Sequence, residues 1–187
     1  TLTLAKGNYI ASVSGAGTYK VGKKVTVTAT LSASATGYTN SFTGWTSASE
    51  VTIENATTLS ATVTIPASNV TITANGTRTA NTDTPYVVYH YLENANDTGY
   101  TLAKTENKAG TTNSTLTLAN LATTVTNGTY SKGSLTENGT TATTATIAAD
   151  GSTKIYLYYA RNKHTLTVSS GNHIASTTGT GSYKVGQ

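Results

Sequence analysis

The stretch Thr1-Leu-Thr-Leu-Ala-Lys-Gly-Asn-Tyr-Ile-Ala-Ser12 opens the chain, and Thr165-Leu-Thr-Val-Ser-Ser-Gly-Asn-His-Ile-Ala-Ser176 begins it again near the end. At an offset of 164 residues, 14 of the 23 positions in 165–187 are identical to those in 1–23, and both copies contain a Tyr-Lys-Val-Gly run. This unit is longer than the ~20–50 residues of common solenoid repeats. The sequence therefore predicts a tandem array whose repeating unit contains one or more whole domains.

The composition favours antiparallel β-structure with a polar, weakly charged surface. Thr is the commonest residue, with 44 of the 187 positions, and its branched side chain suits a pleated strand better than a helix. Only 11% of the residues are charged, well below the ~25% of ordinary soluble domains. We expect a mostly β protein whose strands have one face in water.

Charge and composition also bear on partners and compartment. The net charge is +4, but Lys and Arg are scattered and form no basic stripe, so we expect no nucleic-acid partner. There is no Cys and no Met, the side chains most open to oxidation, which suits an extracellular protein. No apolar run approaches the ~18–20 residues of a membrane span, and no signal peptide is recognisable, so we expect no membrane span in this segment.

The first part of the chain alternates between apolar and polar positions, as short strands do. The alternation is found in five segments: 2–4, 9–13, 25–29, 61–65 and 70–74. Within 9–13 it places Tyr9, Ala11 and Val13 on one face. Pro66-Ala-Ser-Asn69 separates the last two segments and predicts a turn, because Pro cannot donate to a central ladder.

Five short motifs follow one another in residues 1–79. They are Leu2-Thr-Leu4, Gly15-Ala-Gly-Thr-Tyr-Lys-Val-Gly22, Val25-Thr-Val-Thr-Ala29, Phe42-Thr-Gly-Trp45 and Val70-Thr-Ile-Thr-Ala74. In this order and spacing they resemble the divergent internalin B-type repeat of bacterial surface proteins. The resemblance implies a small β-rich spacer or binding module on a secreted bacterial protein, and it does not imply an enzyme.

Residues 79–85 are small, polar and free of pattern, and predict a boundary between two domains. The second domain then opens with Tyr86-Val-Val-Tyr-His-Tyr-Leu92, the richest run of β-forming residues in the chain. Further strands are expected at 100–106, 130–135, 145–147 and 154–159. The stretch 116–122 leaves a short helix and a strand as alternatives.

Four motifs in residues 85–162 suggest a second family. They are Tyr86-Val-Val-Tyr-His-Tyr-Leu92, Gly99-Tyr-Thr-Leu102, Ala149-Asp-Gly-Ser152 and Ile155-Tyr-Leu-Tyr-Tyr-Ala-Arg-Asn162. This half is similar to the β-grasp modules of Gram-positive surface proteins, namely the mucin-binding and internalin B-type repeats. That resemblance implies a β-grasp fold and host or mucosal glycans as ligands. A mucin-binding module carries an acidic Asp-Gly turn after its first strand, whereas the turn Glu93–Gly99 is longer and only partly acidic.

We therefore expect three segments. They are a divergent internalin B-type β repeat at 1–80, a β-grasp-like, mucin-binding-like repeat at 84–163, and the opening strands of the next copy of the first domain at 164–187. Only Lys163-His164 separates the last expected strand from Thr165, and so short a connector limits bending. We expect neighbouring repeats of the same chain as partners, and an elongated array.

Few residues are candidates for metal binding. The three histidines, His90, His164 and His173, share no ligand spacing. Glu93, Asn96 and Asp97 lie within one turn, but the regular spacing and the last carboxylate of a calcium loop are missing, and a plain turn is favoured. We nominate no metal ligand.

The sequence also lacks the patterns of catalysis. No Gly-x-Ser-x-Gly elbow and no clustered carboxylates occur. Gly15-Ala-Gly17 has no helix after it, so a phosphate cradle is not supported. We nominate no catalytic or cofactor-binding residue, expect no cofactor, and do not expect an enzyme.

The aromatic residues leave two interpretations open. Trp45 and Phe42 form either an exposed sugar platform or, as favoured for a lone Trp in so small a domain, an anchor in the core. Six tyrosines fall on both faces of their expected strands: Tyr86, Tyr89, Tyr91, Tyr156, Tyr158 and Tyr159. Some of them should therefore be exposed.

A covalent cross-link is a further alternative. Many bacterial surface domains carry a self-formed Lys–Asn amide bond promoted by a buried acid. Lys104, Lys108, Asn162 and Glu106 are the residues of the right types near the first and last strands of the second domain. Solvated Lys and turn Asn are the commoner roles of these residues.

Three functions fit these patterns. The favoured one is a non-enzymatic stalk or spacer of an extracellular, cell-surface adhesin-like protein of a Gram-positive bacterium, either anchored to the cell wall or secreted. The second is an adhesion module that binds glycans or mucin through the β-grasp half. The third is a subunit of a self-assembling extracellular filament, in which strand edges pair with another chain.

Overall fold

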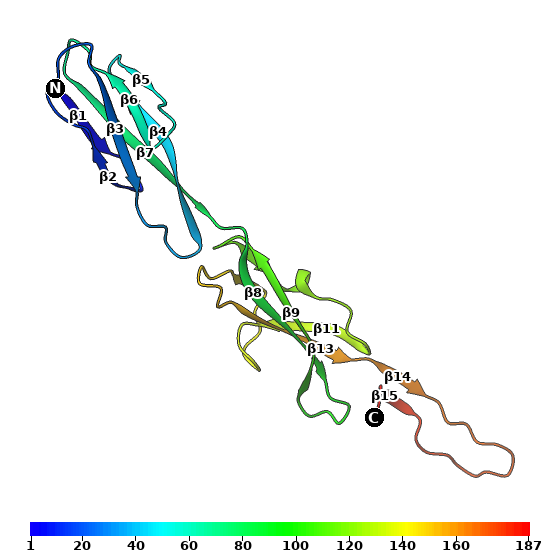
Figure 1. Cartoon of the computed structure of the whole chain (residues 1–187). Helices are drawn as coiled ribbons and strands as arrows, with labels where there is room; N and C mark the ends of the chain where they lie inside the picture. The colour runs from blue at the N-terminus through cyan, green and yellow to red at the C-terminus, as the bar shows by residue number, and fades with distance from the viewer. The chain divides into compact units, whose positions relative to one another are not determined.

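The computed structural model describes all of residues 1–187, and the chain divides into two compact units, Thr1–Asn81 and Thr82–Gln187. Both units are built from strands, and the one helical element is a short 3-10 turn (Figure 1). This composition confirms the predicted mostly β fold. No helix in the structure combines the length and the apolar character that crossing a bilayer requires.

The first unit consists of two sheets around one core. Its strands are β1 (Leu2–Lys6), β2 (Ile10–Ser14), β3 (Lys24–Leu31), β4 (Tyr38–Ser47), β5 (Thr52–Glu54), β6 (Ser60–Thr64) and β7 (Val70–Ala80). One sheet has the order β1-β7-β4 and the other β2-β3-β6-β5. Apolar side chains from both sheets are buried in the same cluster. Two half-polar sheets thereby cover each other's apolar faces.

The core of this unit follows the alternation expected from the sequence. Every second residue is buried along 25–29, 61–65 and 70–74, and these residues form most of the cluster. Trp45 joins them from β4 and is 4% exposed. The predicted period of two is therefore confirmed in β3, β6 and β7.

The alternation predicted for residues 9–13 is wrong. Tyr9 has a positive φ of 60° and lies in the turn before β2, and it is Ile10 that enters the core. A bulge between Ile10 and Ser12 inserts an extra residue opposite β3. The bulge lets Ile10 and Val13 pack on the same core, although they are three positions apart.

The segment predicted as a patternless boundary is also mostly strand. Thr79 and Ala80 pair with Thr39 and Tyr38, because β4 and β7 form a long hairpin-like ladder beyond the core. Only three residues lie between the end of β7 and the start of β8 (Thr84–Glu93). The residues here are small or polar, and Thr39 Oγ1 donates to Asn81 Oδ1 at 2.8 Å beside the backbone ladder. No hydrophobic alternation therefore marks the strand in the sequence.

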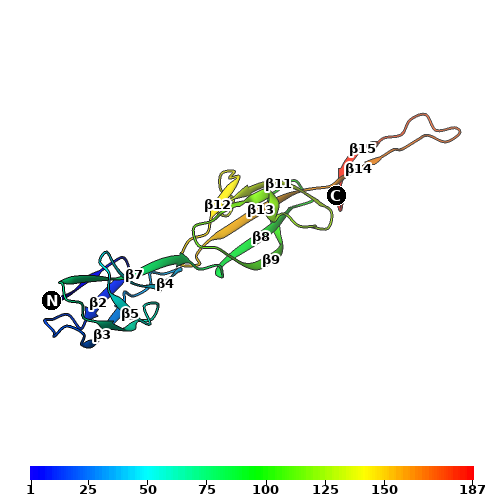
Figure 2. The same ribbon diagram turned by 90° about the horizontal axis from the view of Figure 1, so that it is seen from above.

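The second unit is a four-stranded sheet with two smaller ladders. Its further elements are β9 (Tyr100–Gly110), β10 (Thr115–Thr117), the 3-10 turn η1 (Leu118–Leu121), β11 (Gly128–Ser134), β12 (Thr144–Thr146), β13 (Lys154–Arg161), β14 (Lys163–Leu166) and β15 (Gly181–Lys184). The main sheet has the order β11-β13-β8-β9, while β10 pairs with β12 and β14 with β15. Figure 2 shows the long loop that joins β14 to β15.

The stretch 116–122 adopts both of the alternatives left open by the sequence. Residues 115–117 form β10, and the chain then turns into η1, whose Leu118 is fully buried. Leu118 packs with Val88, Ile155 and Leu157 on the inner face of the main sheet. A short strand and a single 3-10 turn therefore close the core at this stretch.

In each unit the first strand has a parallel neighbour, which is β7 for β1 and β13 for β8. β1 pairs with β7 from Leu2–Val70 to Lys6–Ala74. β8 pairs with β13 from Val87–Lys154 to Leu92–Tyr159. The parallel pair β8–β13 lies at the centre of its sheet, as in a β-grasp fold.

Candidate functional site

The hairpin β14–β15 repeats the first strand pairing of the first unit. Leu166 pairs with Gly181, and Leu2 forms the equivalent bridge with Gly17. In both copies the following tyrosine hydroxyl bonds back to a glycine carbonyl: Tyr19 to Gly15 at 3.1 Å and Tyr183 to Gly179 at 2.8 Å. The repeated sequence thus folds in the same register at both places.

The backbone geometry of the two copies agrees as well. Tyr9 and His173 occupy equivalent positions and have φ values of 60° and 64°. Gly15 and Gly179 have φ values of 107° and 100°. A positive φ is costly for a residue with a Cβ. His173 nevertheless adopts the same left-handed turn conformation as Tyr9 at the equivalent position.

Lys184 of β15 binds two carboxylates, one at the end of β8 and one in the loop that follows it. Its Nζ donates to Glu93 Oε1 at 2.7 Å and to Asp97 Oδ1. Lys184 is only 6% exposed, although it lies in a two-stranded hairpin. We call Glu93, Asp97 and Lys184 the lysine clamp. It ties the hairpin to the loop 93–99.

Arg161, the last residue of β13, adds a second connection between the same elements. Its Nε donates to the carbonyl of Glu93 at 2.7 Å, and its backbone N–H donates to Glu93 Oε2 at 3.1 Å. Its Nη1 donates to the carbonyl of Val185 at 3.1 Å. The N–H of Val185 in turn donates to the carbonyl of Asn162 at 3.0 Å. The turn after β15 is therefore bonded to the end of β13 through both side chain and backbone.

The three charges of the clamp shift one another's titration. The hydrogen bonds from Lys184 and from the Arg161 backbone hold the pKa of Glu93 below its ordinary value. The bond from Lys184 likewise lowers the pKa of Asp97. The bonds to Asp97 and Glu93 raise the pKa of Lys184. All three groups are therefore held in their charged forms around neutral pH.

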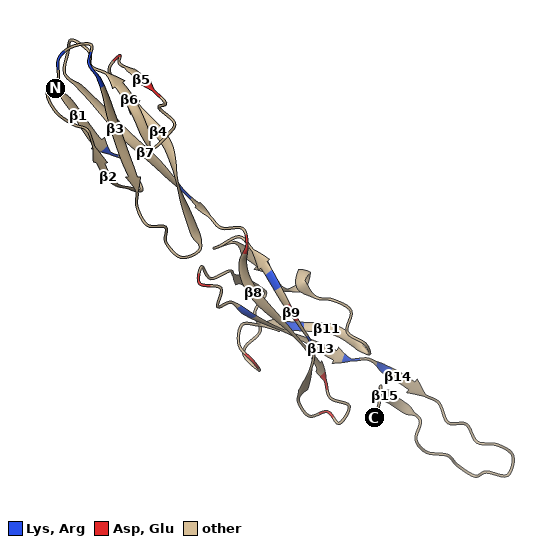
Figure 3. Ribbon diagram, in the orientation of Figure 1, with Lys and Arg blue, Asp and Glu red and all other residues tan.

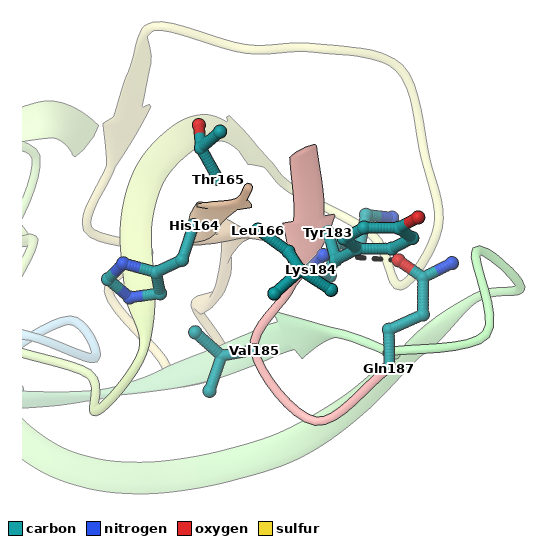
Figure 4. A pocket seen from close by; sticks show the side chains of 7 residues that line it. All are labelled: His164, Thr165, Leu166, Tyr183, Lys184, Val185 and Gln187. Atoms are coloured by element: carbon teal, nitrogen blue, oxygen red, sulfur yellow. Dashed lines mark hydrogen bonds between the residues drawn. The ribbon is translucent and has the colours of Figure 1, made fainter. Parts of the chain in front are cut away.

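A hollow of about 450 Å³ lies against the hairpin and is lined by His164, Thr165, Leu166, Tyr183, Lys184, Val185 and Gln187 (Figure 4). Leu166 and Tyr183 are equivalent to Leu2 and Tyr19, which pack in the core of the first unit. The hollow is thus the open side of a partial core, and it has no convergent set of polar groups.

Glu93, Asn96 and Asp97, for which a plain turn is favoured over a calcium loop, bind protein groups. Glu93 and Asp97 bind the ammonium group of Lys184, and Asn96 Oδ1 accepts the N–H of Thr98 at 3.2 Å. No group of three or more His, Cys, Asp or Glu side chains suited to a metal occurs in the chain. The favoured interpretation as a turn agrees with these bonds.

His90 lies in a buried polar chain inside the second unit. Thr123 N–H donates to the Tyr159 hydroxyl at 3.0 Å, and that hydroxyl lies 3.0 Å from His90 Nδ1. His90 Nε2 lies 3.1 Å from Glu106 Oε2. A carboxylate only accepts, so Nε2 carries the proton, and Tyr159 donates to Nδ1. His90 is therefore satisfied by hydrogen bonds to protein groups.

Charge reinforces this arrangement. Lys104 lies 2.7 Å and Lys108 3.4 Å from the carboxylate of Glu106. The bond from Lys104, together with that from His90, lowers the pKa of Glu106 to about 2. Burial lowers the pKa of His90, and the attraction of Glu106 only partly opposes it. The neutral imidazole is the form that the folded unit favours.

The structure does not bring together the residues of the alternative Lys–Asn cross-link. Lys104 and Lys108 lie on the edge strand β9, which is separated from β13 by β8. Asn162 follows β13, and its Oδ1 accepts a 2.7 Å bond from Thr129. Both lysines are paired with Glu106, as solvated ion pairs of a sheet edge.

Trp45 is a core anchor, as favoured from the sequence. Its Nε1–H donates to the carbonyl of Thr58 at 3.1 Å, and Phe42 meets its ring edge-on at 5.9 Å between centroids. Gly15-Ala-Gly17 lies between strands, where Leu2 pairs with Gly17. Neither the sugar platform nor the phosphate cradle is present at these residues.

The tyrosines are divided between two faces of the main sheet, as expected. Tyr86 and Tyr159 are buried in the core, whereas four others stack on the outer face: Tyr89, Tyr91, Tyr156 and Tyr158. Ring centroids are 5.2 Å apart for Tyr89–Tyr156 and 5.6 Å apart for Tyr91–Tyr158. We call these four residues the tyrosine face.

The tyrosine face is partly covered by the loop after β11. Asn138 N–H donates to the Tyr158 hydroxyl at 2.6 Å, and Tyr91 donates to Glu137 at 2.8 Å. The bond to Glu137, with burial, raises the pKa of Tyr91 to about 12. Tyr158 is fully buried in consequence, while the other three are half-buried.

Sequence reasoning missed the lysine clamp, although one signal pointed to it. Lys184 belongs to the Tyr-Lys-Val-Gly run that is identical in both copies. The sequence places Glu93 and Asp97 in one turn, but it does not indicate that Lys184 binds there. These residues are far apart in the chain. Charged residues are otherwise sparse and dispersed over both units (Figure 3).

A comparison with protein families agrees with the first resemblance. The model of the divergent InlB B-repeat domain matches residues 1–80, and repeats of this type are typical of bacterial surface proteins. The match ends where the first unit ends, so the likeness of residues 85–162 to mucin-binding repeats stays a prediction. No curated protein and no solved structure matches the chain.

Proposed function

We propose that residues 1–187 are a segment of a tandem-repeat spacer of an extracellular bacterial surface protein, and that the segment is not an enzyme. The observation that carries the proposal is the repeated register: Leu166–Gly181 in the hairpin and Leu2–Gly17 in the first unit. A second copy of the first fold begins directly after β13, through the strand β14. The repeat-domain match of residues 1–80 agrees with this role.

The junction supports a spacer because it restricts motion. A flexible linker would let successive units reorient freely. Here Lys163 and His164 are instead paired with Lys184 and Tyr183 in a strand ladder. The lysine clamp and Arg161 hold that ladder to the second unit. Repeats joined in this way keep a fixed separation.

The test adds residues 24–81 after Gln187, because Gln187 corresponds to Lys23. We expect the added residues to complete a second folded copy, with a second buried Trp and a blue-shifted tryptophan emission. The maximum dimension from small-angle scattering should grow with each further unit. The matched control carries Leu166→Asp, which places a charge where Leu2 lies in the core. If the second Trp of the extended chain with the native Leu166 stays exposed to solvent, the proposal is contradicted.

A glycan-binding role is the second candidate, and the tyrosine face favours it. Tyr89, Tyr91 and Tyr156 present partly exposed rings on one sheet face. Aromatic rings of this kind combine an apolar face with a polar tip. A glycan array probed with the whole chain and with a Tyr89→Ala, Tyr156→Ala variant tests this role. Binding that the double variant loses would support it, whereas fibres in the electron microscope would support self-association.

A further inference from the structure

The two copies of the Tyr-Lys-Val-Gly run differ in one respect, namely what covers them. Lys184 is 6% exposed and bound by two carboxylates, whereas its counterpart Lys20 is exposed and its ammonium group has no partner. Val185 is half-buried, whereas Val21 is 67% exposed. The same Lys-Val pair is thus covered by contacts with other residues at 184–185 and exposed to solvent at 20–21.

The backbone shows the same contrast. The N–H of Val185 donates to Asn162, and its carbonyl accepts a bond from Arg161. Neither the N–H nor the carbonyl of Val21 forms a hydrogen bond within the chain. The Lys20–Val21 turn therefore has exposed backbone groups, an exposed Val side chain and an unpaired Lys. The equivalent groups of Lys184 and Val185 all have partners.

The bare copy already has the shape of the covered one. Lys23 N–H donates to the carbonyl of Lys20 at 3.2 Å, and Gln187 N–H donates to that of Lys184 at 3.0 Å. Gly22 and Gly186 have φ values of 78° and 85°. Docking therefore requires no rearrangement of the turn, which lowers the entropy that association costs.

We propose that the Lys20–Val21 turn is a docking surface for a further copy of the second unit that precedes Thr1 in the tandem array, and that this copy contributes its Glu93–Asp97 loop and the end of its β13. The covered copy shows how the contact is made: two carboxylates take the Lys ammonium, and Arg161 with Asn162 takes the backbone of the Val. Charges are complementary, because Lys20 is a free cation and Glu93 with Asp97 carries two negative charges. The two residues that precede Thr1 in such an array would pair with Tyr19 and Lys20, as Lys163 and His164 pair with Lys184 and Tyr183.

This inference rests on the tandem arrangement of the proposed function and adds the contact that fixes successive units. The experiment joins a second copy of residues 82–164 in front of Thr1 of the whole chain, so that His164 precedes Thr1 as it precedes Thr165. Lysine acetylation with a soluble acylating reagent is then followed by peptide mass spectrometry. In the unextended chain we expect Lys20 to react fast and Lys184 slowly.

In the extended chain we expect Lys20 to react about tenfold more slowly, because labelling then requires local opening of the contact. Lys24, which forms an exposed ion pair with Glu54 in the same unit, should react equally in both chains and is the matched control. Glu93→Gln and Asp97→Asn, introduced together in the added copy alone, should restore fast labelling of Lys20.

Two outcomes would overturn the docking surface. Lys20 could react as fast in the extended chain as in the unextended one, or its protection could survive the two loop substitutions. The circular dichroism of the extended chain separates this failure from failure of the spacer. A folded extra unit with reactive Lys20 contradicts the docking contact only, whereas an unfolded extra unit contradicts the tandem arrangement.

Discussion

Leu2 and Leu166 occupy the same position in two copies of one hairpin, and each pairs with a glycine, Gly17 or Gly181. Leu2 is 1% exposed, and Leu166 is 52% exposed. The pairing therefore forms without the core that surrounds Leu2 in the first unit. A two-stranded hairpin is marginal by itself in water, so the contacts of β15 with the second unit must contribute to its order.

Removing the ammonium group of Lys184 should release the hairpin. We expect Lys184→Gln to accelerate amide hydrogen exchange in Ser182 to Lys184 by roughly tenfold, because opening no longer breaks two ion pairs. Lys154→Gln, at an exposed position of β13 outside the clamp, is the control and should leave these rates unchanged. Equal rates in the two variants would show that the clamp does not hold β15.

The clamp should also open at acid pH. The pKa values of Glu93 and Asp97 are lowered in the folded state, so their stabilising effect is present above the ordinary carboxyl range of about 4. It is lost as the pH falls through the lower folded values. At the other end, the raised pKa of Lys184 keeps its contribution until the pH rises above the ordinary Lys value of about 10.4. Carboxyl carbon NMR shifts should place both acids below ordinary values, and Lys184→Gln should bring them back.

The second unit should lose stability below neutral pH because of His90. Burial lowers the pKa of His90, so the unfolded chain binds a proton at about pH 6.5 that the folded chain does not. Stability therefore falls as the pH decreases from 7, with a slope of at most about 1.4 kcal/mol per pH unit from this group. The pKa of Glu106, lowered to about 2, adds a second loss below about pH 4.

Denaturant unfolding followed by the circular dichroism of the second unit measures this slope. His90→Gln should lower stability at pH 7 and flatten the dependence between pH 7 and 5. The first unit provides an internal control, because the only Trp of the chain is Trp45 and its fluorescence reports that unit alone. An unchanged slope in the variant would exclude His90 as its source.

Trp45 should be the costliest single side chain to remove from the first unit. Trp45→Ala leaves a cavity and an unpaired carbonyl at Thr58, and we expect it to destabilise the unit by about 3–5 kcal/mol. Phe42→Ala, at the half-buried neighbour, should cost distinctly less. Thermal unfolding followed by far-ultraviolet circular dichroism compares the two. Similar losses in both variants would contradict a central role for Trp45.

The sequence predicts this fold best where burial is one-sided. In β3 the pattern Val25, Val27, Ala29 is strict because one face meets the core and the other meets water. The prediction of alternation fails at Ile10, because the bulge adds a residue to the strand and no local sequence pattern indicates a bulge. It also fails at Thr79 and Ala80, where backbone pairing continues without any apolar side chain to mark it.

The site was less predictable for a related reason. The bond from Lys184 to Glu93 joins residues that are far apart in the chain and adjacent only in the folded unit. Single charged residues in loops carry no periodicity, so their partners cannot be assigned from spacing. Tyr158 shows the same limit: its strand position places it on the outer face, yet the loop at Asn138 covers it completely.

The parallel pairing of β1 with β7 and of β8 with β13 decides how the two main sheets respond when the ends of these strands are pulled apart. Traction on β1 and β7 in opposite directions makes parallel neighbours slide past each other. The five register pairs from Leu2–Val70 to Lys6–Ala74 are then sheared together instead of opening one after another. The six pairs of β8 with β13 are placed in the same way. We expect single-molecule force spectroscopy to find both units mechanically resistant, with rupture occurring at these two ladders and not at the outer strands.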